Sequence, residues 1–300
     1  MRNKDQDAWR DEALDILMAA FSTDDELRAA LIFKGARILS ARLGVAHRYS
    51  RDIDANMTQE FVDGRPETNQ QKQALEELIR NSLERHLARA DPIRYRMESI
   101  RAVRRPRRGH PRGWSAFRIS VRLLDLKNQH VLGLPTLELD VSAPEPLGKH
   151  SVAPLDIGGN QVQAYTLERQ TGDKMKAFLT SLPAYRTKLG GGTEDRTRRV
   201  KDLYDIATVE RAHPVNNEPE FWAVVGDEFR VAAQGRGVDC AGIAAFAEGL
   251  DETRTLYEDS EIFRKNIPFG SAWSALERVL GMMEARGIVP FEFDLPPHID

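Results

Sequence analysis

One stretch, residues 31–54, constrains the fold of this chain more than any other. Its pattern predicts a short strand, a glycine turn, a short helix and a second strand, in this order: residues 32–33, Gly35, residues 36–43 and residues 49–57. Asp52 and Asp54 are two apart in the second strand, so both carboxylates face the same side of it. Two such carboxylates repel each other unless a cation lies between them, and Mg²⁺ with phosphate oxygens is the commonest cation for an all-oxygen site. We therefore expect a metal site here.

The turn before the helix is a candidate phosphate site. Lys34 and Gly35 lie where the first strand passes into the helix, and backbone N–H groups at such a turn can face a phosphate. A phosphate-binding turn followed by a pair of metal-binding carboxylates is the arrangement of a nucleotidyl-transfer site. The rest of the chain is then expected to supply the remaining parts of that site.

The bulk composition is that of a folded soluble protein. The 300 residues suffice for two domains or one large domain, and 41% of them are hydrophobic. Cys240 is the only cysteine, which excludes an internal disulfide or a cysteine zinc site and predicts a cytoplasmic location. The first residues contain no apolar run, and no window approaches the roughly 20 apolar residues that span a bilayer, so neither a signal peptide nor a membrane partner is expected.

The chain as a whole has an α+β pattern, a mixed sheet with helices followed by a helical C-terminal region. A capping box, Thr23-Asp-Asp-Glu26, begins a helix over residues 24–31. Further elements expected before residue 167 are helices at 6–20 and 70–90 and strands at 94–103, 114–124, 137–142 and 162–166. Later residues predict only helices, at 168–182, 198–212, 218–233, 239–249 and 271–286, with a closing tail from Phe291. We predict a first domain over residues 1–165 and a helical domain over residues 166–300 that completes the active site.

Asp140 is a candidate third metal ligand. It alternates with Glu138 on a predicted strand whose leucines and valine point inward. If this strand lies beside that of Asp52 and Asp54, a third carboxylate reaches the same metal, as two-metal phosphoryl transfer requires. The alternative is that Asp140 belongs to the solvent face of an amphipathic strand.

Two helices offer further charged candidates. Lys174 could hold a phosphate as a point charge, although it could equally be an exposed helix lysine. Asp202 and Asp205 are three apart and share one face of a later helix, where acids also favour the positive end of the helix dipole. Placed beside Lys174, Asp205 would orient the lysine.

These segments together resemble a known family. Lys34-Gly35, Arg48-Tyr-Ser-Arg-Asp-Ile-Asp54, Lys174 and Lys201-Asp-Leu-Tyr-Asp-Ile206 are similar, in order, to the AbiEii/AbiGii-type nucleotidyltransferase toxins, the group that includes the MenT toxins. The resemblance covers residues 30 to about 210. It implies a polymerase-beta-like nucleotidyltransferase core, Mg²⁺ or Mn²⁺ as cofactor, an NTP substrate, tRNA or another acceptor, and a cognate antitoxin or a role in phage defence.

The resemblance also implies roles for individual residues. Asp52, Asp54 and Asp140 would be metal ligands, Ser50 would lie beside the phosphates, and Lys174 would bind the triphosphate with Asp202 or Asp205 placing it. The chain departs from the family pattern at Ala36 and Arg37, where the family has a second glycine and a small hydroxyl residue. Arg37 could itself hold a phosphate, or it could fill the pocket.

Two alternatives to this enzyme remain open on the sequence. A catalytically altered binding protein on the same fold would explain the changes at Ala36 and Arg37. A phosphatase of the haloacid dehalogenase class also uses an Asp-x-Asp, but it needs a hydrophobic strand before that motif, whereas Arg48-Tyr-Ser-Arg51 stands here.

An arginine-rich segment lies between two predicted strands. It could follow an RNA backbone with Trp114 as a stacking face, or it could be a solvated hairpin tip. Its candidate RNA-binding residues are Arg104, Arg105, Arg107 and Arg108.

Overall fold

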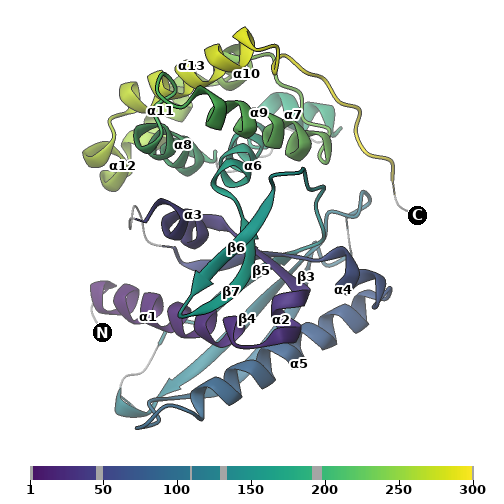
Figure 1. Ribbon diagram of the computed structural model, residues 1–300, viewed down its shortest axis with the longest axis vertical. Coiled ribbons are helices and arrows are strands. Elements are labelled where there is room, and N and C mark those ends of the chain that lie inside the picture. Colours follow the sequence, from purple (N-terminus) through teal and green to yellow (C-terminus); the bar gives the residue numbers. More distant parts are fainter. Residues whose placement is uncertain (1–2, 45–49, 109, 129–133, 191–197, 299–300) are drawn as a thin grey trace.

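A seven-stranded mixed sheet forms the centre of the first half of the chain (Figure 1). The computed structural model describes residues 3–44, 50–108, 110–128, 134–190 and 198–298. The strand order is β3-β4-β5-β2-β1-β7-β6, with β2 parallel to β5, β1 parallel to β7, and the other pairs antiparallel. The strands are β1 (Leu31–Lys34), β2 (Asp52–Met57), β3 (Tyr95–Arg105), β4 (Ala116–Asp125), β5 (Leu137–Ser142), β6 (Val152–Ile157) and β7 (Asn160–Tyr165).

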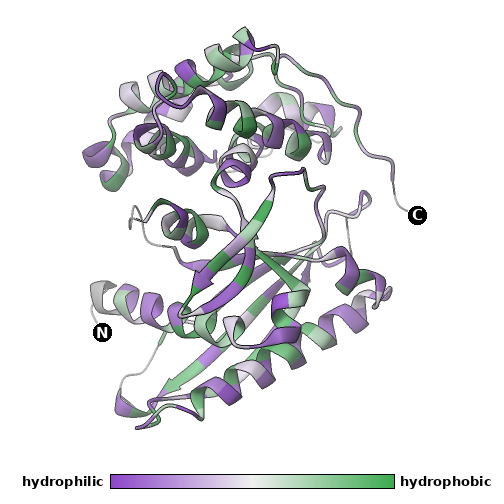
Figure 2. Cartoon of the chain, in the orientation of Figure 1, coloured by the Kyte–Doolittle hydropathy of each residue, from purple (hydrophilic) through white to green (hydrophobic). Residues whose placement is uncertain are grey.

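One face of this sheet is apolar and is covered by helices. Side chains that alternate along β4, such as Phe117, Ile119 and Val121, are buried in one cluster with residues of α1 and α5. Hydrophobic and hydrophilic residues alternate along α5 (Figure 2), as expected of a helix with one buried face. The polar side chains of β2, β4 and β5 therefore point to the opposite face. The N-terminal helices are α1 (Asn3–Ser22), α2 (Asp25–Ala30), α3 (Gly35–Leu43), α4 (Gln59–Asp63) and α5 (Thr68–Leu87).

The second half of the described chain is helical and has its own apolar cluster, which includes the fully buried Trp222. In Figure 1 these helices stack on the side of α3 that faces away from α1. Helices α6 and α9 pack closely because Gly172 has no side chain: a Cβ there would lie 2.6 Å from the backbone nitrogen of Phe229. The helices are α6 (Leu167–Thr180), α7 (Pro183–Lys188), α8 (Val200–Ala212), α9 (Pro219–Gln234), α10 (Ile243–Phe246), α11 (Leu250–Glu258), α12 (Glu261–Asn266) and α13 (Phe269–Ala285).

The predicted α+β class is confirmed, and most element boundaries agree within a few residues. The strand β6 was not predicted, because Pro154 interrupts its pattern; as an edge strand it tolerates a residue without an N–H. The predicted helix over 239–249 is reduced to α10, and Asp24 rather than Thr23 caps α2. The helices α4, α7, α11 and α12 were also not predicted. They have five to nine residues, too few for a clear period.

The closing segment is held more firmly than the predicted tail. Phe291 pairs with Cys240 in an isolated antiparallel bridge, and Lys188 donates to the carbonyl of Phe293 at 2.5 Å. The division into domains at residue 165 stays a prediction. Among the described residues, no helix is both long and apolar enough to cross a membrane.

Candidate active site

Three carboxylates meet on the open face of the sheet. Asp52 and Asp54 lie on β2 and Asp140 lies on the parallel neighbour β5, directly opposite Asp54. One carboxylate oxygen from each lies within 4.8 Å of the others, so the three could hold a metal ion. A hard divalent cation prefers oxygen ligands of this kind, so the residues fit such an ion. We call this group the acidic wall.

The acidic wall carries unfavourable charge. Burial and the nearby carboxylate of Asp52 raise the pKa of Asp54 to about 6, even though Lys34 and Lys201 act in the opposite direction. The buried hydroxyl of Ser50 donates to the backbone oxygen of Asp52 at 2.9 Å and lies 3.3 Å from its carboxylate. Ser50 therefore orients the metal-ligand strand.

Arg118 stands beside Asp140 on the neighbouring strand β4. Its Nε and Nη2 each donate to one carboxylate oxygen at 3.0 Å, in a bidentate pair. The carboxylate raises the pKa of Arg118 further above its ordinary value. Since each carboxylate oxygen keeps a second lone pair, Asp140 can hold this pair and still reach a metal ion.

The glycine turn approaches the acidic wall closely. Gly35 has a φ of +83°, and a Cβ at this position would lie 2.1 Å from Oδ2 of Asp54, so both its conformation and its surroundings require glycine. Its N–H donates to Oε1 of Gln170 at 3.2 Å. Lys34 pairs with Asp54 across the two strands, and although burial lowers its pKa, the charges of Glu145, Asp173 and Asp54 outweigh burial and raise it.

A cleft of about 660 Å³ lies over the acidic wall and is closed on the other side by helices. Lys174 of α6 lines it, with its ammonium 2.5 Å from Asp205 and 3.6 Å from Asp202, both fully buried on α8. Further cations that line the cleft also have carboxylate partners: Lys176 with Asp173, Arg199 with Asp202, and Arg236 with Glu145. We call Lys174, Lys176, Arg199 and Arg236 the cationic wall.

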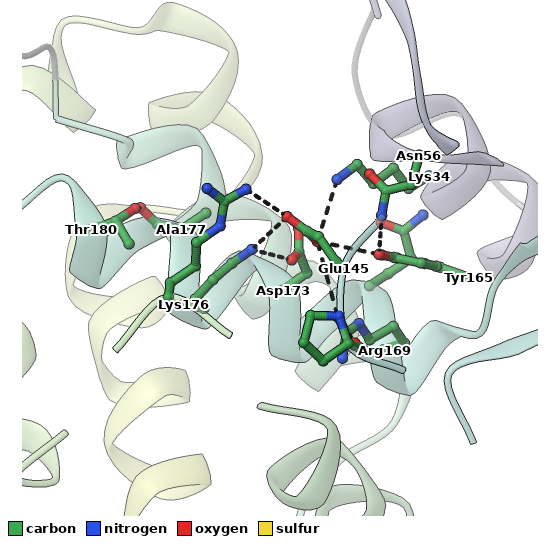
Figure 3. A network of polar contacts seen from close by, with 12 residues as sticks. Lys34, Asn56, Glu145, Tyr165, Arg169, Asp173, Lys176, Ala177 and Thr180 are labelled. Atoms are coloured by element: carbon green, nitrogen blue, oxygen red, sulfur yellow. Dashed lines mark hydrogen bonds and ion pairs between the residues drawn. The ribbon is translucent and has the colours of Figure 1, made fainter. Parts of the chain in front are cut away.

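Glu145 connects the sheet to the cationic wall (Figure 3). It lies in the loop after β5, and its carboxylate is 3.6 Å from Lys34, 3.7 Å from Lys176 and 2.9 Å from Arg236. Burial raises the pKa of Glu145, but these cations outweigh it and hold the pKa well below its usual range. The hydroxyl of Tyr165 also donates to this carboxylate at 3.3 Å.

Arg37 points away from the cleft. Its guanidinium donates at 2.6 Å to Asp11 and to Asp15, both on α1, and it does not line the cleft. Arg37 thus anchors α3 to α1, and we do not retain it among the nucleotide-binding candidates.

The arginine-rich hairpin reaches the cleft with part of its predicted set. Arg105 lines the cleft with His110 and Trp114, whereas Arg107 and Arg108 are exposed outside it. Arg104 donates to the hydroxyl of Ser115 at 3.3 Å. The guanidinium of Arg236 lies 4.8 Å from the centre of the Trp114 ring. The hairpin therefore meets the helical half at one end of the cleft.

Several residues of the cleft were not among the predicted site residues: Arg118, Glu145, Gln170, Lys176, Arg199 and Arg236. For Arg118 a signal existed, since it alternates with the buried residues of β4 and so faces the acids. For Glu145 no signal existed. It lies in the Pro144-Glu145-Pro146 loop, and its partners Lys34, Lys176 and Arg236 are distant in sequence. Of the predicted motif residues, Arg48 and Tyr49 lie outside the described residues.

The chain is similar in sequence to one protein family and in fold to a solved structure. A family model described as nucleotidyl transferase AbiEii toxin, type IV toxin–antitoxin system, matches residues 16–278. Among curated proteins, none matches the chain in sequence. The crystal structure of JHP933 from Helicobacter pylori is similar with a TM-score of 0.51 at 12% identity, covering 94% of this chain and 93% of that one, which shows a shared fold.

Two other solved structures are similar at lower scores. The nucleotidyltransferase toxin MenT4 of Mycobacterium tuberculosis has a TM-score of 0.46 at 14% identity, over 93% of this chain and 84% of that one. ANT(2″)-Ia in complex with adenylyl-2″-tobramycin has a TM-score of 0.32 at 14% identity, over 72% of this chain and 95% of that one.

Proposed function

Because the chain belongs to the AbiEii family of nucleotidyltransferase toxins, we propose that it transfers a nucleoside monophosphate from an NTP to an RNA, with Mg²⁺ or Mn²⁺ as its cofactor. The observation that carries this proposal is the pairing of two opposed walls in one cleft. Three carboxylates form one wall, and four cations form the other. A metal-bound triphosphate presents the complementary charges.

In this proposal the acidic wall binds the divalent ion. An ion held there supplies charge that favours the deprotonated acceptor hydroxyl and neutralises the phosphates. The acceptor hydroxyl gives its proton to water, its oxygen forms a bond to the α-phosphorus while the bond from that phosphorus to the oxygen of the β-phosphate breaks, and pyrophosphate leaves. Ser50 and Arg118 keep Asp52 and Asp140 in place for this step.

The cationic wall binds the β- and γ-phosphates. Lys174 is held by Asp205 and Asp202, and Arg199 is held by Asp202, so their charges are positioned before the nucleotide arrives. Lys34 adds a further cation beside this wall, because Glu145 contacts both Lys34 and Lys176. Arg37 leaves the cleft open, which favours an enzyme over the altered binding protein.

The acceptor enters, we propose, along the arginine-rich hairpin. Arg105, His110 and Trp114 line the cleft at that end, where they could contact a single-stranded RNA end by charge and stacking. A tRNA 3′ end has this form. The partner that restrains the toxin would be a cognate antitoxin protein.

The proposal is tested by incubating the protein with Mg²⁺, total RNA and each of four α-labelled NTPs in turn, and by repeating the assay with total protein as acceptor. We expect label on RNA from one NTP, and none with Asp52→Asn. Equal labelling by wild type and this variant would refute the site assignment. Growth arrest on expression, relieved by the neighbouring gene, tests the toxin–antitoxin role.

A further inference from the structure

We infer that Gln170 is a phosphate-binding residue of the cleft, whose side-chain amide donates to the triphosphate beside the Gly35 turn. This inference rests on the proposed function. Gln170 is on the second turn of α6, only 2% exposed, and it lines the cleft. It precedes Lys174 by four residues, so the two side chains share one face of the helix.

The hydrogen bonds of Gln170 identify which of its atoms is available. Its Oε1 accepts from the N–H of Gly35 at 3.2 Å, which fixes the orientation of the amide. Its Nε2 is buried and has no hydrogen-bond partner among the residues that the structure describes. A buried donor without an acceptor is unfavourable, and such groups in folded proteins call for an explanation.

The surroundings of this amide favour a phosphate oxygen as its acceptor. The Gly35 backbone lies against Asp54 of the acidic wall, and Lys34 and Lys174 line the same cleft. An anion bridging the two walls therefore passes the end of Gln170. The cations of the opposite wall already have carboxylate partners, whereas Nε2 of Gln170 has no partner among the described residues.

The departure from the family pattern supports the same assignment. The resembled family has a small hydroxyl residue two positions after the glycine, but this chain has Arg37, which turns to α1. The turn thus lacks the hydroxyl donor of the family pattern. Gln170 on α6 supplies a donor in its place, because the hydrogen bond from Gly35 to Oε1 keeps the side-chain amide beside the turn.

Three substitutions separate phosphate binding from support of the turn. Gln170→Glu keeps an acceptor for Gly35 but replaces the donor with a charged oxygen that repels phosphate. Gln170→Lys keeps a donor but loses the acceptor, and Gln170→Ala loses both. Gln163→Glu makes the same charge change at an exposed position on β7 and is the matched control.

The experiment measures binding of inorganic tripolyphosphate with Mg²⁺ by calorimetry, after thermal unfolding has shown each variant to be folded. The probe has no ribose or base, so it reports the phosphate site alone. We expect Gln170→Glu to bind about tenfold more weakly than wild type or worse, Gln170→Ala to lie between, and Gln170→Lys and the control to stay within about threefold.

The opposite order would overturn the inference. If Gln170→Glu binds as wild type does while Gln170→Ala and Gln170→Lys bind weakly, Gln170 acts only by holding Gly35. If Gln170→Glu does not fold, the affinities of Gln170→Lys and Gln170→Ala still test the inference. Both lack the acceptor for Gly35, so tighter binding by Gln170→Lys supports a donor role and equal binding contradicts it. Wild type that neither binds tripolyphosphate nor transfers nucleotide would instead refute the proposed function.

Discussion

The two walls of the cleft differ in how their charges are balanced by neighbouring side chains. On the cationic wall, each of the four lysine and arginine side chains has a carboxylate within 4.0 Å, and Asp202 and Asp205 are fully buried behind it. On the acidic wall, Arg118 is the one cation of the described residues that lies within 4.0 Å of a carboxylate, that of Asp140, while Asp52 and Asp54 lie two residues apart on the same strand. The pKa of Asp54 is accordingly raised to about 6 by burial and by Asp52.

The cationic wall, but not the acidic wall, has its charges balanced in the protein without metal or nucleotide. The cations are already positioned, so the charges that would contact the triphosphate need no rearrangement. The carboxylates are held together against their repulsion by the β2–β5 pairing, and a divalent ion would relieve that repulsion. The carboxylates that bind the metal should therefore lower the stability of the metal-free protein. The cations that bind the triphosphate should raise it.

The largest expected effect comes from the acidic wall. Asp54→Asn should lower nucleotide transfer by on the order of 10³-fold or more, because the metal loses a ligand. The same change should leave the melting temperature of the metal-free protein unchanged or higher, since it removes repulsion. Asp63→Asn, an exposed aspartate on α4, is the control for both assays. A variant that loses activity only by unfolding would contradict this contrast.

A change in the cationic wall should also abolish transfer, but it should lower the stability of the protein. Lys174→Ala removes the ammonium that lies 2.5 Å from the buried Asp205 carboxylate, so we expect transfer to be lost and unfolding to require about 3–5 kcal/mol less. Chemical denaturation measures the change. Lys265→Ala breaks an exposed pair with Glu261 and should leave stability unaltered. Equal stability of wild type and Lys174→Ala would show that this wall is not held by its ion pairs.

Two glycines test how closely the turn approaches the acidic wall. Gly35 and Gly44 both have a positive φ, but only Gly35 has Asp54 in the way of a Cβ. Gly44→Ala should cost about 1 kcal/mol from conformation alone. Gly35→Ala should cost more and should also weaken Mn²⁺ binding, because it displaces the Asp54 carboxylate. Similar costs and unaltered Mn²⁺ affinity in both variants would remove Gly35 from the site.

The raised pKa of Asp54 predicts a pH dependence. Below pH 6 a proton competes with the metal, so Mg²⁺ affinity should fall by up to about tenfold per pH unit. In the metal-free protein the sign is reversed: a folded pKa above that of the unfolded chain favours folding fully below about pH 4, and this contribution is lost as pH rises through 6. Both dependences should be weaker in Asp54→Asn.

The smallest effect should come from outside both walls. Arg37→Ala breaks the contacts of α3 with Asp11 and Asp15 on α1, and so lowers stability modestly. The KM for the NTP should not change, because Arg37 does not line the cleft. Steady-state kinetics beside a thermal melt would show this, and a raised KM at unaltered melting temperature would return Arg37 to the nucleotide site.

The acidic wall was more predictable from sequence than the cationic wall. The spacing of Asp52 and Asp54 and the turn at Gly35 are local, so the strand period alone places them. Asp140 needed one assumption, that its strand is the neighbour of β2, and the parallel β2–β5 pairing meets it. The strand β6 was missed because Pro154 is allowed only at an edge, which sequence period does not reveal.

The cationic wall depends on contacts between distant residues. Lys174 and Asp205 were predicted to pair, and they do, but Arg236 and Glu145 are 91 residues apart and carry no shared pattern. Gln170 differs again. Its importance is visible only from its hydrogen bonds: Oε1 accepts from Gly35, while Nε2 has no partner within the described part of the chain. Such residues are recognised by three-dimensional proximity.

The most direct test is to measure Mn²⁺ binding to the metal-free protein by electron paramagnetic resonance. If Asp52, Asp54 and Asp140 form the metal site, wild type should bind Mn²⁺ and Asp52→Asn, Asp54→Asn and Asp140→Asn should each weaken binding strongly, while Asp63→Asn should not. Binding by these three variants equal to that of wild type would place the metal elsewhere and contradict the account.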